Sequence, residues 1–299
     1  MPKSIKTLGL IGRVTNPGVK ETLKILIDYL HHLDKKTFID QETAASLADV
    51  QLDVLKRNEL GKKCDLIIVV GGDGSLINAA HTLVKDQVPV LGINRGSLGF
   101  LTDIHPTELI KIRSILEGNF ILEKRFLLTA TISLNSKELG DKTNHRQALN
   151  EFALIPDAVP QMIEFEVYIN DKFVLSQRSD GLIIATPTGS TAYSLSAGGP
   201  ILHPQLDAMV MVPMFPHTLS VRPIVINANQ EVKISISPNN KTAPRLACDG
   251  HAYVNTPAGS QINITKSTQA LQLVHPQDYD YYETLRSKLH WGHKLQYSE

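Results

Sequence analysis

The sequence predicts an α/β N-terminal domain with a parallel, Rossmann-like sheet, followed by an all-β C-terminal domain of sandwich type. Two observations support this order. In the first third of the chain, short apolar runs alternate with segments of helical spacing, as in repeated β-α-β units. Beyond the stretch 102–125, closely spaced segments instead alternate polar and apolar side chains, which is typical of half-exposed antiparallel strands.

The elements of the first domain follow from its apolar runs. Strands are expected at 8–11, 37–39, 66–70 and 90–93, and helices over 18–33, 44–60 and 75–84. The run 66–70 is unbroken, as expected of a strand that is covered on both faces. The helix over 44–60 rests on leucines at 47, 52, 55 and 60.

The second domain is expected to contain short strands separated by turns. Residues 164–169, 231–236 and 261–264 alternate with period two, and Asn170-Asp171 forms a turn before a returning strand at 173–175. The tail over 279–295 is helical again and is expected to pack back on the first domain. The predicted domains are therefore 1–103 with the tail 275–299, and 104–274.

Composition excludes several classes of protein. The 299 residues include 42% hydrophobic and 20% charged side chains, which excludes a disordered chain. The 30 basic and 30 acidic residues balance, which argues against a dedicated nucleic-acid binder. No segment approaches the ~18 apolar residues of a membrane helix, so no membrane partner is expected. Two cysteines, Cys64 and Cys248, suit a reducing cytoplasm and are expected to be buried.

A glycine turn, Gly71-Gly72-Asp73-Gly74-Ser75, directly follows the unbroken strand and opens a helix. Glycines let backbone N–H groups approach a phosphate, and the helix start adds unpaired N–H groups. The carboxylate of Asp73 could hold Mg²⁺ or accept the proton of an attacking hydroxyl. Alternatively, Asp73 caps its helix and the glycines only shape the turn. Neither a Walker-type nor a G-x-G-x-x-G motif occurs.

A second glycine-bearing turn, 94–101, follows the next strand and is expected at the same edge of the sheet. Gly96 and Gly99 could line the same crevice as the first turn. Phe100 could stack on a base or be an ordinary core aromatic residue.

The segment 180–200 is the densest polar signal in the chain. A buried strand leads into Pro187-Thr188-Gly189-Ser190, small hydroxyl residues follow, and Gly198-Gly199-Pro200 ends the segment. These donors suit the ribose and base of a nucleotide, with Tyr193 as a stacking or hydroxyl contact. The alternative is a Ser/Thr-rich loop that binds its own backbone. A serine-hydrolase elbow is excluded because the G-x-S-x-G spacing is absent around Ser196.

Three further features have weaker signals. Asn150-Glu151 precedes an apolar run and could bind two ribose hydroxyls as a donor–acceptor pair. His251, in an acid-glycine turn, could meet a phosphate or be a surface histidine. His290 and His293 lie one helical turn apart without a nearby third ligand, so no protein metal site is expected there.

Taken together, five motifs resemble those of the NAD kinase family in order and spacing. They are Gly71-Gly72-Asp73-Gly74, Leu98-Gly99-Phe100-Leu101, Asn150-Glu151, the segment from Asp180-Gly181 to Gly198-Gly199-Pro200, and the segment from His217 to Pro223. The run from Thr186 to Tyr193 is the most specific of them. The Gly-Gly-Asp-Gly turn is less specific, because diacylglycerol-type lipid kinases and phosphofructokinases carry similar turns.

The resemblance implies ATP-dependent phosphorylation of the 2′-hydroxyl of the adenosine ribose of NAD, which gives NADP. By motif, Asp73 would accept the proton, Gly72 and Gly74 would shape the phosphate turn, and Asn150 and Glu151 would bind ribose hydroxyls. Asp180 would face the nicotinamide end with Arg178 beside it. The remaining nucleotide contacts would come from Phe100, Thr188, Thr191, Ala192, Tyr193, Ser196 and His251.

Phosphoryl-transfer chemistry, the two cysteines and the resemblance together predict a cofactor, a compartment and partners. Mg²⁺ would be bound mainly through ATP, and the protein is expected in the cytoplasm. The resemblance implies a homo-oligomer, a dimer or tetramer, whose sites a neighbouring subunit helps to complete. Two rival functions are a lipid kinase of the diacylglycerol type and a nucleotide-binding regulatory module without catalysis. The first would need an exposed apolar or basic membrane-facing surface, and the sequence shows no basic amphipathic helix.

Overall fold

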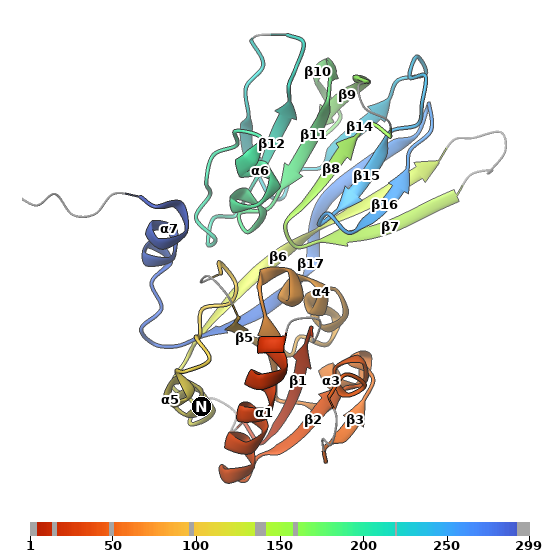
Figure 1. Ribbon diagram of the computed structural model, residues 1–299. Helices are drawn as coiled ribbons and strands as arrows, with labels where there is room; N and C mark the ends of the chain where they lie inside the picture. Colours follow the sequence, from red (N-terminus) through yellow and green to blue (C-terminus); the bar gives the residue numbers. More distant parts are fainter. Residues whose placement is uncertain are drawn as a thin grey trace, which may run out of the picture. The chain divides into compact units, whose positions relative to one another are not determined.

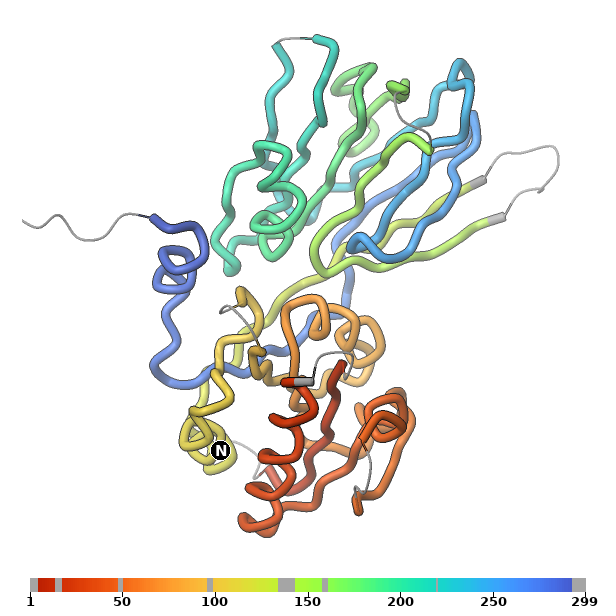
Figure 2. Tube along the Cα trace, viewed as in Figure 1, coloured from red at the N-terminus to blue at the C-terminus, as the bar shows by residue number. Residues whose placement is uncertain are grey.

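The computed structural model describes residues 5–13, 17–47, 51–95, 99–134, 142–157, 161–218 and 220–291. The chain divides into two compact units, Met1–Lys124 with Leu271–Glu299, and Arg125–Ala270. Figure 1 shows the elements of each unit, and Figure 2 traces the chain out of the first unit and back into it.

The first unit is built on a parallel sheet in the order β3-β2-β1-β4-β5-β17. Its strands are β1 (Thr7–Gly12), β2 (Lys36–Asp40), β3 (Asp53–Leu55), β4 (Leu66–Gly71), β5 (Pro89–Asn94) and the end of β17 (Gln261–His275). The order reverses between β1 and β4, and ligands of open α/β sheets bind at the carboxyl ends of strands beside such a reversal. The turns that follow β4 and β5 are therefore well placed for a site.

Helices accompany this sheet as the apolar spacing predicts. They are α1 (Pro17–His32), α2 (Gln41–Ala44), α3 (Arg57–Lys63), α4 (Asp73–Leu83) with the 3₁₀ turn η1 (Val84–Asp86), α5 (Leu109–Leu116) and α7 (Tyr281–Leu289). Leu23, Leu26 and Leu30 of α1 share one hydrophobic cluster with Leu8 and Leu10 of β1. Their i, i+3, i+7 spacing places them on one face of the helix, so the predicted α/β domain is confirmed.

The predicted helix over 44–60 is wrong. The chain instead forms the short helix α2, the strand β3, which pairs with β2, and the helix α3. The leucines that suggested one helix are spaced by five, three and five residues, so they do not repeat on a single helical face. Local polar contacts fix the new boundaries, because Asp40 accepts the N–H of Thr43 at 3.3 Å and Glu59 accepts that of Lys56 at 3.0 Å.

The second unit contains two antiparallel sheets. One sheet runs in the order β13-β12-β11-β8-β15-β16, and the other contains β10-β9-β14-β17 with β6 and β7. The strands are β6 (Ile121–Leu134), β7 (Lys142–Ala148), β8 (Glu151–Ile155), β9 (Ile163–Ile169), β10 (Lys172–Ser179), β11 (Gly181–Ala185), β12 (Ala208–Met214), β13 (Ile224–Asn227), β14 (Val232–Ile236), β15 (Arg245–Cys248) and β16 (Ala252–Asn255). Side chains from both sheets share one core, including Phe152 and Phe165, so the predicted sandwich is confirmed.

The strand β11 is buried on both faces. Leu182 and Ile184 belong to the core between the sheets, whereas Ile183 and Ala185 belong to a second cluster with Leu202. This explains why residues 182–185 form an uninterrupted apolar run rather than an alternating one. The hydroxyl-rich segment after β11 contains the 3₁₀ turn η2 (Gly189–Thr191) and the single-turn helix α6 (Tyr193–Ser196).

The predicted helical tail is confirmed where the structure describes it. The helix α7 ends at Leu289, His290 adopts a φ of 52°, and residues 292–295 of the predicted helix, with His293, lie outside the described residues. This tail belongs to the first unit, where Nζ of Lys111 in α5 lies 3.0 Å from Oδ2 of Asp278.

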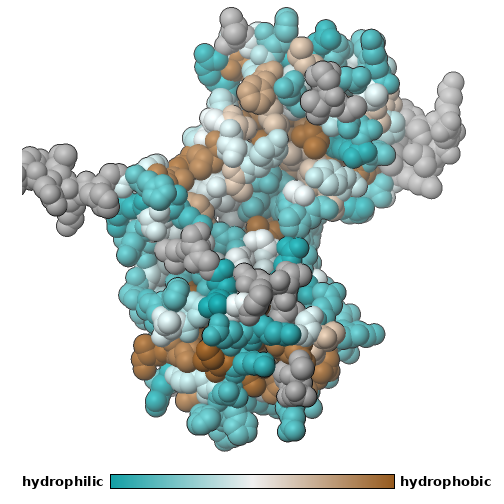
Figure 3. Space-filling view, in the orientation of Figure 1, coloured by the Kyte–Doolittle hydropathy of each residue, from teal (hydrophilic) through white to brown (hydrophobic). Residues whose placement is uncertain are grey.

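The surface and the cysteines agree with the sequence analysis. Cys64 and Cys248 are free and buried, and burial raises the pKa of both thiols to about 12. On the face in Figure 3, hydrophobic side chains lie in limited patches among hydrophilic ones. Within the described ranges, no helix combines the length and the apolar character needed to cross a bilayer.

Candidate active site

The glycine turn at the end of β4 carries Asp73 as the first residue of α4. The carboxylate of Asp73 binds a neighbouring loop rather than its own helix. Its Oδ2 accepts the N–H of Phe100 at 2.8 Å, and its Oδ1 accepts the N–H of Leu101 and the hydroxyl of Thr102, each at 3.1 Å. The alternative that Asp73 caps α4 is therefore wrong, because Gly72 is the N-cap and Asp73 joins the two glycine-bearing turns.

The glycines around this carboxylate are either tightly packed or open to solvent on the side where a Cβ would lie. A Cβ added at Gly99 would overlap Oδ1 of Asp73 and the hydroxyl of Thr102, so only glycine fits there. A Cβ added at Gly72 or Gly74 would meet nothing within 4 Å, so the first turn of α4 is open at these two positions. Open backbone at a helix start suits an anionic ligand. Gly96 lies outside the described residues.

In the second unit, Asp249 organises the Asn150-Glu151 pair. Its carboxylate accepts the backbone N–H groups of Leu149 and Asn150 at 2.8 Å and that of Glu151 at 3.0 Å. The N–H of Asp249 in turn donates to the carbonyl of Glu151 at 3.1 Å. Asp249 is not among the residues predicted from the sequence, although the Asp-Gly turn after a short apolar run is a usable signal. Three backbone N–H bonds to one carboxylate hold the pair at the start of β8.

Glu151 is buried and incompletely bonded. Its residue is 6% exposed, the backbone N–H of Tyr193 donates to its carboxylate, and its Oε2 has no hydrogen-bond partner among the described residues. The pKa of Glu151 is raised to about 8, first by burial and then by the negative charge of Asp249, while the hydrogen bond from the Tyr193 N–H acts in the opposite direction. A buried carboxyl oxygen without a partner is suited to a ligand hydroxyl.

The hydroxyl-rich segment divides into two parts. Thr186, Ser190 and Thr191 use their hydroxyls on the chain itself, donating to the carbonyls of Leu149 at 2.6 Å, Pro187 at 2.6 Å and Thr188 at 3.1 Å. For the hydroxyls of these three residues, the alternative of a self-bonded loop is the better description.

The other part of the segment presents groups that a ligand could reach. Tyr193 is 43% exposed, and its pKa is raised by burial and by the charges of Glu151 and Tyr253. Ala192 is half-buried beside it. Thr188 is buried and accepts a hydrogen bond from Nη1 of Arg125 at 3.4 Å. The structure therefore brings Tyr193 to Glu151, which directly follows Asn150 in the chain, and their nucleotide-binding roles stay predictions.

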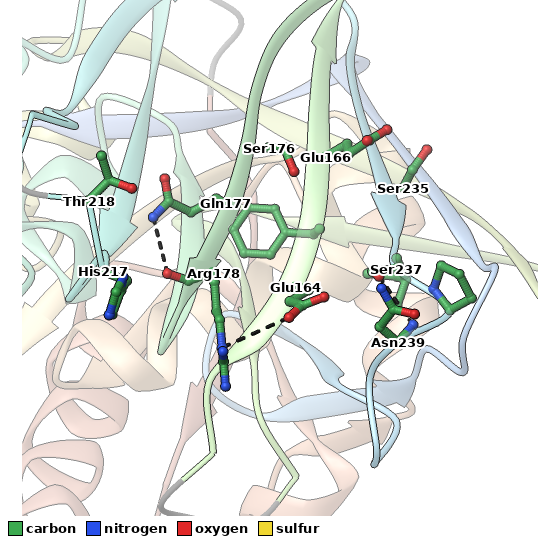
Figure 4. A pocket seen from close by; sticks show the side chains of 13 residues that line it. Glu164, Glu166, Ser176, Gln177, Arg178, His217, Thr218, Ser235, Ser237 and Asn239 are labelled. Atoms are coloured by element: carbon green, nitrogen blue, oxygen red, sulfur yellow. Dashed lines mark hydrogen bonds and ion pairs between the residues drawn. The ribbon is translucent and has the colours of Figure 1, made fainter.

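A pocket of about 520 Å³ lies in the second unit at β9, β10 and β14 (Figure 4). Arg178 lines it, and its Nε lies 3.9 Å from Oε1 of Glu164 (Figure 4). His217 and Thr218 line the same pocket, and the N–H of His217 donates to the carbonyl of Arg178 at 3.1 Å. Two of the sequence motifs, the one that contains Arg178 and the one that begins at His217, therefore meet here.

The remaining candidates lie at the surface. Asp180, Ser196 and His251 are exposed, and their side chains make no hydrogen bond with the rest of the described chain. Phe100 is half-buried and contributes its backbone N–H to Asp73. The nucleotide-binding roles of these four residues stay predictions.

Comparison with known proteins decides the family. The family model described as ATP-NAD kinase N-terminal domain matches residues 16–120, and that described as ATP-NAD kinase C-terminal domain matches residues 149–276. The chain belongs to the NAD kinase family. Among NAD kinases, it is 52% identical to that of Coxiella burnetii (strain RSA 493 / Nine Mile phase I) over 289 residues, which is 96% of this chain and 95% of the relative. It is 48% identical to that of Pseudomonas fluorescens (strain Pf0-1) over 294 residues, which is 98% of each chain.

Solved structures of an NADH kinase and an NAD kinase share the fold. The yeast NADH kinase, solved in complex with NADH, superimposes with a TM-score of 0.88 over 100% of this chain and 91% of its own, at 22% identity. The NAD kinase of Archaeoglobus fulgidus, solved in complex with ATP, gives a TM-score of 0.67 over 95% of this chain and 98% of its own, also at 22% identity. Both likenesses support the α/β domain and the β sandwich described above.

Changing Glu151 to glutamine is expected to alter how stability depends on pH. Because the folded-state pKa is raised, the folded protein keeps a proton that the unfolded chain releases between pH 4.5 and about 8. Wild-type stability therefore falls as the pH rises through that window, by at most about 1.4 kcal/mol per pH unit. Glu151→Gln has no proton to release, so its free energy of unfolding should not show this fall. Between pH 5 and pH 8, the free energy of unfolding of the variant should therefore rise relative to that of the wild type.

Urea unfolding at pH 5, 6.5, 8 and 9 measures the difference between the two proteins. The exposed Glu231 of the same unit, changed to glutamine, is the control and should give a curve parallel to the wild type. Parallel curves for Glu151→Gln as well would contradict the buried, protonated state of Glu151.

Proposed function

We propose that this NAD kinase family member transfers the γ-phosphoryl group of ATP to the 2′-hydroxyl of the adenosine ribose of NAD and so produces NADP. The observation that carries the proposal is the carboxylate of Asp73. A carboxylate offers about four acceptor positions, and three donors already occupy positions on Asp73, two of them on Oδ1. The vacant position on Oδ2 suits one hydroxyl donor.

The proposed reaction needs this single proton acceptor. As the 2′-oxygen forms its bond to the γ-phosphorus and the bond to the β-γ bridging oxygen breaks, the 2′-hydroxyl proton passes to Oδ2 of Asp73. The loop amides fix the carboxylate before substrate arrives, so little reorganisation is needed during the step. The open backbone at Gly72 and Gly74 supports a role in phosphate binding.

The second unit is proposed to hold NAD. Glu151 has an unpartnered buried oxygen and Asn150 lies beside it, which suits two ribose hydroxyls. Tyr193 is exposed next to Glu151 and offers a ring and a hydroxyl to the adenosine. Thr188, Thr191, Ala192 and Ser196 are proposed to complete the nucleotide contacts, with Arg178 and Asp180 at the nicotinamide end.

Mg²⁺ is proposed to be bound mainly through ATP rather than by protein side chains. Mg²⁺ requires near-octahedral oxygen ligands, and three of the four acceptor positions of Asp73 are taken. Among the described residues, no group of three or more His, Cys, Asp or Glu side chains could hold a metal ion. When bound, the ion neutralises charge that develops on the phosphates.

The protein is also proposed to be a cytoplasmic homo-oligomer, a dimer or tetramer. Two buried free cysteines suit a reducing compartment. The strand β13 lies at the end of its sheet, and its residues Ile224 and Val225 are 40% and 46% exposed. Exposed apolar side chains on an edge strand suit an interface between second units.

One assay tests the proposed activity. The purified protein is incubated with ATP, Mg²⁺ and either NAD or a diacylglycerol, and NADP is measured with an NADP-specific dehydrogenase. We expect NADP to form with NAD and no phosphorylated lipid to form. NAD binding without NADP would instead support a regulatory module, and lipid phosphorylation would support a lipid kinase.

A further inference from the structure

A buried charge cluster in the first unit belongs to none of the site motifs. His275, the last residue of β17, is 1% exposed, and its ring lies between two buried carboxylates. Its Nδ1 lies 2.8 Å from Oδ2 of Asp103, and its Nε2 lies 3.2 Å from Oε2 of Glu123. The ring of Tyr279 stacks on the imidazole with centroids 3.9 Å apart and an interplanar angle of 12°.

The geometry determines the protonation state of the ring. Ionised carboxylates only accept hydrogen bonds, so an imidazole that binds one at each nitrogen must donate from both and must be positively charged. Burial lowers the pKa of His275, but the hydrogen bonds to Asp103 and Glu123 and their charges outweigh burial and raise it above the usual 6.5. A neutral ring would leave one nitrogen lone pair facing a carboxylate.

The cluster joins three segments of the first unit. Asp103 lies in the loop after β5, Glu123 lies near the start of β6, and His275 ends β17. The side-chain exposures of the three are 7%, 8% and 1%, so water does not replace these bonds. His275 therefore fixes the loop after β5 to two strands.

That loop is the one that binds Asp73. Asp103 directly follows Thr102, whose hydroxyl donates to Oδ1 of Asp73 and whose carbonyl accepts from the N–H of Gly99 at 3.1 Å. The side chain of Asn94 also donates to the Thr102 carbonyl at 3.1 Å. On the C-terminal side of Thr102, the charged contact of this loop is the one between Asp103 and His275.

We propose that protonated His275 is a positioning residue, which holds Asp103 and, through the adjoining Thr102, keeps the carboxylate of Asp73 in the orientation that accepts the substrate proton. This inference rests on the proposed function of Asp73. The titratable groups that face the ring are Asp103 from the loop, Glu123 from β6 and Tyr279 after β17. When the ring loses its proton, one carboxylate bond is lost and the loop is held less firmly.

The first test reads the loop without any assay of activity. Hydrogen exchange measured by NMR reports the N–H groups of Phe100 and Leu101, which donate to Asp73. We expect His275→Gln to lower their protection by about ten-fold while core amides of β1 change little. The ring resonance missing from the variant identifies His275, whose titration midpoint in the wild type should lie above pH 6.5. Unchanged protection at both amides overturns the proposal.

The second test reads catalysis. We expect kcat of His275→Gln to be about ten-fold below the wild type at pH 6, with KM values within about two-fold. The His275 ring binds both carboxylates only while it is protonated. The ratio of the two kcat values should therefore approach one as pH rises above the pKa of His275. The effects of other titrating groups on kcat are common to both proteins and cancel in this ratio. His31→Gln, at the exposed end of α1, is the control and should match the wild type at every pH.

A second variant keeps the test decisive if His275→Gln does not fold. Asp103→Asn preserves size and hydrogen bonding but removes one negative charge beside the ring, so the pKa of His275 should be lower in this variant. Its kcat should therefore fall at a lower pH than that of the wild type. A role in folding alone would lower the unfolding midpoint without moving that pH. Wild-type protein that makes no NADP would overturn the proposed function, whereas active wild type with a pH-independent ratio overturns only the role of His275.

Discussion

Replacing Asp73 by asparagine is expected to lower kcat for NADP formation by at least ten-fold, and by on the order of 10²–10⁴-fold if Asp73 supplies all of the general-base catalysis. Asparagine retains size but cannot take a proton from the ribose hydroxyl. Its amide N–H₂ would also face a loop N–H group that now donates to a carboxylate oxygen of Asp73. Steady-state NADP formation at saturating ATP and NAD measures the loss.

Two variants separate the chemistry of Asp73 from its contacts. Asp28→Asn, on the exposed face of α1, makes the same change away from the site and should leave kcat unaltered. Thr102→Val removes one of the three donors but keeps the carboxylate, so its loss of kcat should be much smaller than that of Asp73→Asn. The unfolding midpoint should change little in the two control variants, and Asp73→Asn should remain folded at the assay temperature. Unchanged turnover in Asp73→Asn would remove this carboxylate from the reaction.

Replacing Gly189 by alanine is expected to lower the free energy of unfolding by about 3 kcal/mol and to abolish tight NAD binding. The added Cβ would overlap the carbonyl of Asn150 and lie 2.7 Å from its Cα. The turn cannot move aside easily, because the N–H of Thr186 donates to the Asn150 carbonyl at 2.9 Å and the Gly189 N–H donates to the Thr186 hydroxyl at 3.1 Å. Asn150 would therefore shift from its place beside Glu151.

The matched control for stability is Gly74→Ala. A Cβ at Gly74 meets nothing within 4 Å, and alanine is favoured over glycine inside a helix by about 1 kcal/mol, so stability should not fall. Urea unfolding and calorimetric titration with NAD measure both variants. Wild-type stability and NAD affinity in Gly189→Ala would show that the turn relaxes without cost and that the close approach is not required.

The parts of the fold that could be predicted from sequence are those with a strong local pattern. The unbroken apolar run of β4 predicts a strand buried on both faces, and the period-two alternation of β9 predicts a strand buried on one face. In both cases the residues of the strand itself carry the pattern. The stretch 44–60 has no such pattern. There β3 is three residues long and is fixed by pairing with β2, a contact that is remote in sequence.

The candidate site shows the same division. Asp73 and Glu151 could be identified because each stands in a motif beside a strand end. Asp249 and Thr102 were missed, because their roles depend on which backbone N–H groups and carboxylates the fold brings to them. His275 and Asp103 are 172 positions apart in the chain, and nothing local to either residue indicates a partner.

The discontinuous first unit has a consequence for synthesis of the protein. The parallel sheet is complete only when the end of β17 pairs with β5, for example Leu273 with Val90. A nascent chain that has reached Lys124 therefore still exposes one edge of β5. This edge stays unpaired until the end of β17 has been synthesised, when nearly the whole chain has been translated. We infer that the N-terminal half cannot mature first and independently on the ribosome, and that a fragment truncated before residue 271 would expose this edge to aggregation.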